Sequence, residues 1–256
     1  MLPVSLILSV GTAFIFSVAV PIILLFVLGI QRKITFSSLL TGGLYFFLLR
    51  VFLVNMISTL LSSIPFISTI INTPVIAMLI TIFLISTTDI LGRKYFYSHS
   101  KKKCQDFRSV LGLGLGQGFF EVQITIGLNA LNCLFITIAL FTHQESIFLA
   151  QGASSADLTL AIEAFKATDP MIFIESSIFS IATLLLHCVL AFLIQHSIRL
   201  KDSPFNLIIA WVLSLTLNSI QLFIANFNNV LAAIFAIIWI LYLLFWIKRK
   251  DALSLI

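Results

Sequence analysis

Long apolar stretches with at most one charged residue each follow one another along almost the whole chain. A helix needs about 20 consecutive apolar residues to cross a hydrocarbon core of about 30 Å. Seven stretches meet this requirement, and they cover roughly residues 4–30, 36–62, 67–92, 109–141, 171–198, 204–225 and 230–247. The sequence therefore predicts an all-α polytopic membrane protein, in which residues 1–256 form one bundle of about seven transmembrane helices.

The composition excludes the main alternatives. Of the 256 residues, 60% are hydrophobic and 10% are Asp, Glu, Lys or Arg, whereas soluble domains carry about 25% charged residues. The formal net charge is +5, but the basic residues form short clusters between apolar runs, so no nucleic-acid partner is predicted. The three cysteines lack CxxC spacing, so the sequence indicates neither a disulfide framework nor a thiolate zinc site.

The basic residues predict the orientation of the spans. Thirteen of the 15 Lys and Arg residues lie in four segments, 31–33, 93–108, 199–201 and 248–250. These segments alternate with the spans and therefore fall on one side, which the positive-inside rule makes cytoplasmic. We expect an outer N-terminus, a cytoplasmic C-terminus and a location in the plasma membrane of a bacterium. The first stretch has no basic segment before it and no cleavage site, so it is predicted to be a retained helix.

Two details of the threading are also predicted. Residues 143–170 contain four acids and one base and form the only sizeable outer segment, in which a short amphipathic helix is expected around Leu158 to Phe165. The stretch 109–141 is too long for one straight span. It is expected to tilt, to break near its glycines or to continue outside the membrane.

Polar residues inside the spans are the main indication of a functional site, because an ionisable group at mid-bilayer costs several kcal/mol unless it is paired or hydrated. Counted from the cytoplasmic ends at about 1.5 Å per residue, Glu121, His187 and Asn218 all lie at roughly 18–21 Å. Each belongs to a polar stripe of its helix, so the three stripes are predicted to line one chamber. Asp89, by the same count from Arg93, lies only about 6 Å deep.

These groups admit more than one interpretation. A carboxylate, an imidazole and an amide at one level could bind a metal, hold a water for hydrolysis, or form hydrogen bonds between helices. Arg50 is predicted to form a buried ion pair, with Glu121 as the candidate partner. The run of glycines over 112–118 provides two pairs of small residues at i, i+4 spacing, which favour close helix packing beside Glu121.

The segment GLGLGQGFFEVQITIGLNALN over residues 112–132 resembles the fourth-helix motif of the YhfC-type intramembrane peptidase family. Leu184-Leu-Leu-His187 resembles the histidine helix of that family, and Asp89-Ile-Leu-Gly-Arg93 resembles its acidic motif, so the resemblance covers roughly 85–220. The wider superfamily includes PrsW, the CAAX-processing proteases and the seven-span scaffold subunit of gamma-secretase. The resemblance implies that Glu121, His187 and Asn218 are the catalytic residues, with Asp89 and Arg93 as weaker candidates.

The chain departs from this pattern at three places. Thr88 and Asp89 replace a glutamate pair, and Gln117 and Ser214 replace histidines. Gln and Ser do not exchange a proton as imidazole does, and they are poor transition-metal ligands. Glu121 and His187 would hold a divalent metal such as zinc only weakly, because catalytic zinc sites usually supply three protein ligands. The sequence therefore favours the absence of a cofactor, with a divalent metal such as zinc as the alternative.

Three functions remain open from the sequence. The departures favour a diverged, inactive homologue of the peptidases that binds a membrane helix, a lipid or a partner subunit. The first alternative is an active glutamic- or metal-type intramembrane protease that uses Glu121 and His187. The second is a small transporter or immunity protein, although the sequence shows neither inverted repeats nor paired broken helices.

Overall fold

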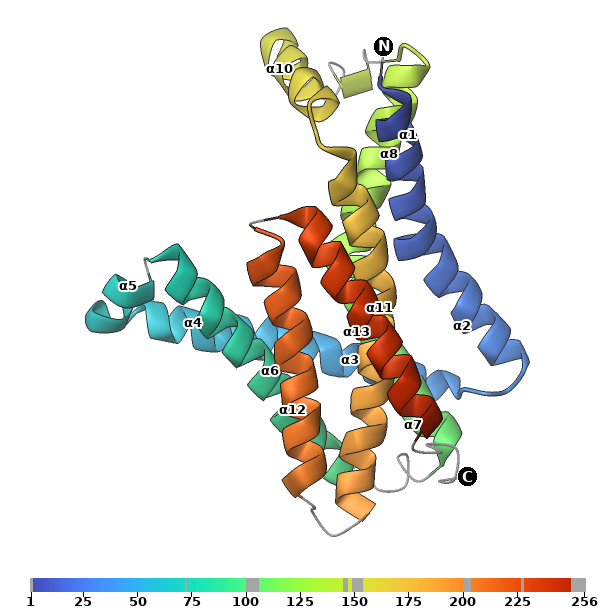
Figure 1. Cartoon of the computed structure of the whole chain (residues 1–256), viewed down its shortest axis with the longest axis vertical. Coiled ribbons are helices and arrows are strands. Elements are labelled where there is room, and N and C mark those ends of the chain that lie inside the picture. Colours follow the sequence, from blue (N-terminus) through green and yellow to red (C-terminus); the bar gives the residue numbers. More distant parts are fainter. Residues whose placement is uncertain are drawn as a thin grey trace.

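A computed structural model describes residues 2–71, 73–99, 106–144, 147–148, 154–199, 204–226 and 228–249, and in these ranges all regular secondary structure is helical (Figure 1). Four short segments, labelled η, are π-helical. The elements are α1 (Val4–Phe14), η1 (Ile15–Ala19), α2 (Val20–Ile30), α3 (Phe36–Phe46), η2 (Phe47–Leu53), α4 (Val54–Ser62), α5 (Pro65–Ile71), α6 (Pro74–His99), α7 (Phe107–Val122), η4 (Gln123–Gly127), α8 (Leu128–Phe141), α10 (Ser155–Lys166), α11 (Pro170–Arg199), α12 (Pro204–Ser219), η5 (Ile220–Ile224) and α13 (Asn229–Arg249).

Six helices in the described part of the chain are long and apolar enough to cross a membrane. They are Val4–Ile30, Phe36–Ser62, Pro74–His99, Phe107–Phe141, Pro170–Arg199 and Pro204–Leu222. The chain is thus an all-α protein with the helices of a multi-pass membrane protein. The seventh predicted span corresponds to α13, which is apolar over Asn229–Leu243, and both the count of seven and the orientation stay predictions.

The third predicted stretch, 67–92, differs from the structure at both ends. The chain forms a short helix, α5, and then begins α6 at Pro74, because proline is well accommodated in the first turn of a helix. At the other end α6 continues past Arg93 to His99, because Arg93 is buried and paired inside the bundle. Asp89 therefore lies ten residues, or about 15 Å, from the helix end, and its predicted shallow position is wrong.

The long fourth stretch is continuous in the structure. α7, η4 and α8 form one 35-residue helical segment that is π-helical at Gln123–Gly127 and does not break at its glycines. The short helix predicted around Leu158 to Phe165 is present as α10. In Figure 1 the far end of α8 lies near the N-terminus and α10.

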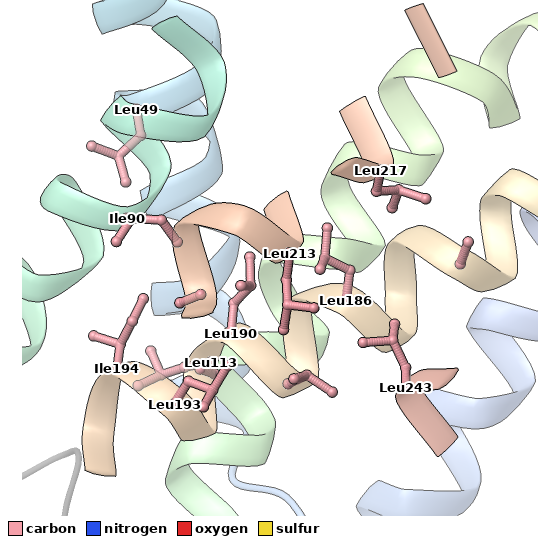
Figure 2. Close-up of a cluster of buried hydrophobic side chains, with 14 of the residues drawn as sticks. Leu49, Ile90, Leu113, Leu186, Leu190, Leu193, Ile194, Leu213, Leu217 and Leu243 are labelled. Carbon is pink, nitrogen blue, oxygen red and sulfur yellow. The ribbon is translucent and has the colours of Figure 1, made fainter. Parts of the chain in front are cut away.

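Helix α11 forms the centre of the bundle. Of its most apolar 18-residue window 72% is buried, against 17–39% for the other five long helices. Figure 2 shows Leu186, Leu190 and Ile194 of this helix among leucines of α7, α12 and α13. A central helix is surrounded by the others on most of its faces, and α11 therefore brings His187 into contact with several neighbouring helices.

The glycine run packs α7 closely against two helices at once, as predicted. A Cβ atom on Gly116 would lie 2.1 Å from the backbone oxygen of Leu39 in α3. A Cβ on Gly114 would lie 2.8 Å from the backbone oxygen of His187 in α11. Only glycine permits both approaches, so this run holds the polar face of α7 against α11.

The helices do not all run parallel. Figure 1 shows α1, α8, α11, α12 and α13 along the long axis, whereas α3, α4 and α6 project to one side with α5 at the tip. The π-helical η2 contacts α6, and α6 also contacts α11 and α12. This crossing places the middle of the second span beside the polar faces of α7 and α12.

Candidate functional site

Seven polar side chains from five helical segments meet in the interior of the bundle, and we call them the polar network. They are Arg50 of η2, Asp89 and Arg93 of α6, Gln117 and Glu121 of α7, His187 of α11 and Asn218 of α12. All except Arg50 are buried, and Arg93 is fully inaccessible to solvent.

His187 lies at the centre of the network. Its Nε2 is 2.8 Å from Oε2 of Glu121, and its Nδ1 contacts the guanidinium Nη2 of Arg93. Because a guanidinium only donates hydrogen bonds, Nδ1 must accept and Nε2–H must donate to the Glu121 carboxylate. The two partners therefore fix the imidazole as the Nε2–H tautomer.

Arg93 is held by a second carboxylate on its own helix. Its Nε donates to Oδ1 of Asp89 and its Nη2 to Oδ2, both at 3.0 Å, which is the paired geometry that arginine forms best with a carboxylate. Gln117 donates to the same Oδ1 of Asp89 at 2.8 Å. Arg93 Nη1 also donates to the backbone oxygen of His187 at 3.3 Å, so Arg93 joins α6 directly to α11.

The other oxygen of Glu121 faces the second span. Oε1 lies 3.3 Å from Nη2 of Arg50, which confirms the predicted ion pair. The same Nη2 donates to Oδ1 of Asn218 at 3.4 Å. The Asn218 amide in turn donates to the Ser86 hydroxyl at 3.3 Å and to the Ser214 backbone oxygen at 2.8 Å. The network thus runs without interruption from α7 to η2, α12 and back to α6.

The charges of the network balance. Arg50 and Arg93 contribute two positive charges, Asp89 and Glu121 two negative ones, and the Nε2–H imidazole of His187 none. Buried charges are tolerated when they are paired, and each of these four charged side chains has a partner of opposite charge. Removal of any one charged member would leave an uncompensated charge inside the bundle.

Three of the four π-helical segments lie next to this network. Arg50 belongs to η2, Glu121 lies two residues before η4, and Asn218 lies two residues before η5. Single π turns inside α-helices occur frequently at functional sites.

A very small cavity lies inside the network. It offers about 10 Å³ to the centre of a water molecule, and its lining includes Glu121, His187, Asn218, Thr183 and Ser214. This is about the space one water needs, and polar partners surround it. A peptide could not enter the cavity as it stands.

The predicted site residues all meet. Glu121, His187 and Asn218 line the one cavity, as the polar stripes predict, and Asp89 lines it too. Arg93 joins them through His187. Asp89 lies beside the other three residues, which corrects its predicted shallow depth. The roles of these residues in catalysis stay predictions.

The donor set does not fit a catalytic metal. In the described ranges no three His, Cys, Asp or Glu side chains are grouped so that they could hold a metal ion. Glu121 and His187 would provide two ligands where catalytic zinc usually has three. Both nitrogens of His187 are already used, and Asp89 is engaged by Arg93 and Gln117.

Two buried polar residues, Ser86 and Glu175, were not singled out from the sequence. Ser86 bonds Asn218, and its position three residues before Asp89, on the same face of α6, was the available signal. Glu175 is buried in α11, and the Asn229 amide, in the orientation that satisfies its hydrogen bonds, donates to Glu175 Oε2 at 3.0 Å. An acid five residues inside an apolar 30-residue helix indicated such a partner.

Comparisons of the chain with models of protein families, with curated proteins and with solved structures find no match. The interpretation of the site therefore rests on its own geometry and chemistry.

Proposed function

We propose that this chain is a non-hydrolytic, multi-pass membrane protein, diverged from the YhfC-type peptidases, that binds a membrane-embedded helix, lipid or partner subunit. One observation carries the proposal: both oxygens of Glu121 and both ring nitrogens of His187 are engaged by groups of the protein itself. The bacterial plasma membrane is the location proposed with it.

A hydrolase that uses these residues would need a base directed at a water. A general base must lie within hydrogen-bond reach of the proton that it removes. Oε1 of Glu121 faces Arg50, Oε2 accepts from His187, and His187 has no ring nitrogen left for a water. Gln117, at the position where the family carries a histidine, holds Asp89 instead. These contacts favour a structural role for the network.

The polar network has a structural role that does not require catalysis. It links η2, α6, α7, α11 and α12 through specific polar contacts. Inside a membrane, lipid tails are as apolar as the helices, so polar contacts and close packing decide which helices associate. The outer faces of the first two spans stay largely unburied and are available to lipid or to a partner.

The second candidate is an active intramembrane protease. The observation that favours it is the cavity for about one water beside Glu121 and His187. On this alternative the water would be activated there after the network rearranges to admit a peptide.

The test is a cleavage assay with the full chain in liposomes that contain a membrane-spanning peptide. We expect no cleavage above that of liposomes without protein, and no change in Glu121→Gln or His187→Ala. An active intramembrane protease in the same liposomes serves as the positive control. Elemental analysis of the purified protein is expected to find less than stoichiometric zinc.

Cleavage by the unmodified chain that disappears in both variants, while circular dichroism shows intact helices, would establish the protease instead. Thr216→Val is a suitable control variant, because the Thr216 hydroxyl bonds only within its own exposed turn of α12. It is expected to behave as the unmodified chain in every assay.

A further inference from the structure

An apolar groove lies on the membrane-facing side of the bundle, away from the polar network. It has a volume of about 490 Å³ and is bounded by α2, α3 and α7. The residues that define it are Leu25, Phe26, Gly29, Ile30, Phe36 and Phe119. This volume falls within the range of about 300–1,000 Å³ that is typical of ligand sites.

The groove exists because α2 separates from the bundle. α1 packs against α8 and α11, whereas α2 diverges from α11 toward its end at Ile30 (Figure 1). Phe26 and Phe36 are 69% and 71% exposed, so they form walls that face the hydrocarbon. The buried side chain of Leu39 forms part of the floor. The groove is thus open to lipid and largely apolar.

Two cationic residues lie in an ordered backbone turn at one end of the groove. After α2, Arg32 adopts a left-handed backbone conformation with φ of 53°. The backbone N–H of Arg32 donates to the backbone oxygen of Gly29 at 3.0 Å. The backbone N–H of Lys33 donates to the backbone oxygen of Leu28 at 2.9 Å. These two hydrogen bonds form a Schellman turn. Arg32 and Lys33 are exposed, and they lie between Ile30 and Phe36 of the groove wall.

The charge around this turn is one-sided. The first 88 residues contain no Asp or Glu, so neither α1–α2 nor α3–α4 provides a counter-charge. At the start of the facing helix, α7, the N-cap residue Asp106 is followed by Arg108 two residues later, so this segment adds no net charge. The end of the groove therefore attracts an anion.

We propose that this groove binds an anionic phospholipid, with one acyl chain along α2 and the phosphate at Arg32 and Lys33. The combination of an apolar channel open to the hydrocarbon and a cationic end matches the two parts of such a lipid. The inference gives a partner to the binding role in the proposed function, but it rests on a different site. It is tested by lipid binding and not by peptide cleavage, so either can fail alone.

Gly29 allows the groove to be filled without disturbing the fold. A Cβ atom there meets no heavy atom within 4 Å, so Gly29→Leu places its side chain in the open groove. Gly11 in α1 has the same open surroundings but does not line the groove, which makes Gly11→Leu the matched control.

The experiment titrates delipidated full chain with phosphatidylglycerol or phosphatidylcholine that carry the same acyl chains, and native mass spectrometry counts the bound lipids. The unmodified protein is expected to bind the first phosphatidylglycerol about 25-fold more tightly than the first phosphatidylcholine, since two cations contribute about fivefold each. Inorganic phosphate is expected not to compete, because it has no acyl chain.

Two kinds of variant separate the two parts of the site. Gly29→Leu is expected to weaken the binding of the first phosphatidylglycerol about tenfold, while Gly11→Leu leaves this affinity unchanged. Arg32→Gln with Lys33→Gln is expected to remove the preference over phosphatidylcholine, whereas Lys166→Gln in α10 keeps it. Equal affinity of the unmodified chain for both lipids, an unaffected Gly29→Leu, or equal losses in Gly11→Leu and Gly29→Leu would each overturn the proposal.

Discussion

Replacement of Glu121 by glutamine is the sharpest test of the charge balance in the polar network. The change keeps the size of the side chain but removes one of the two negative charges that face Arg50 and Arg93. The ion pair with Arg50, 3.3 Å in the structure, is lost. The buried cluster then carries one uncompensated positive charge.

The magnitude follows from the burial of the two partners. Removal of one partner of a buried pair usually costs about 3–5 kcal/mol. The Arg50 side chain is 20% exposed and retains some water, and a glutamine oxygen can still accept from His187 Nε2–H. We therefore expect the lower end, about 3 kcal/mol, which is roughly a hundredfold in the unfolding equilibrium.

The assay is reversible unfolding of the purified protein in mixed micelles, followed by circular dichroism. Arg50→Met, alone and combined with Glu121→Gln, completes a double-mutant cycle. The double variant has a neutral cluster again, so it should be more stable than the sum of the single effects predicts, by about 2 kcal/mol. Glu163→Gln, the same change at an exposed residue of α10, is the control and should leave unfolding unaltered.

Two results would refute this reasoning. One is a Glu121→Gln protein that is as stable as the unmodified chain. The other is strictly additive behaviour of Arg50→Met and Glu121→Gln, which would mean that the two side chains do not stabilise each other.

Two further predictions concern the orientation and the packing. With the native cysteines replaced, a membrane-impermeant maleimide applied to intact cells should label Lys166→Cys and not Lys33→Cys, and the reverse result would overturn the positive-inside orientation. Gly116→Ala should lower the stability by about 1–3 kcal/mol, because its Cβ would lie 2.1 Å from the Leu39 backbone oxygen, whereas Gly11→Ala has open space and should not. Equal stability of Gly116→Ala and Gly11→Ala would show that α3 and α7 do not need this close approach.

Hydropathy and helical periodicity alone predicted the approximate ranges of the six long apolar helices and the polar stripes on three of them. An apolar stretch in a membrane has to be helical, since each backbone group must find its hydrogen bond within the segment. Within one helix the rise per residue is constant, so Glu121, His187 and Asn218 could be assigned a common depth by counting. The pairing of Arg50 with Glu121 followed from the high cost of an unpaired charge there.

The same counting was wrong for Asp89, because it required the position of a helix end. A basic residue normally marks such an end, and Arg93 was interpreted in that way. In the structure Arg93 is buried against Asp89 and His187, and α6 continues to His99. Whether a cation lies at the membrane surface or inside the bundle depends on the partners that other helices bring to it.

Tertiary structure alone decided which atoms meet and where the bundle opens. The tautomer of His187 depends on Arg93 from one helix and Glu121 from another, and therefore on how the three helices are rotated. The π-helical segments had no local sequence signal, and the divergence of α2 that forms the groove depends on how α1 packs against α8 and α11. The composition of a helix and the spacing of its polar residues determine which of its faces is polar. The crossing angle between two helices, and the rotation of each about its own axis, arise from packing between segments far apart in the sequence.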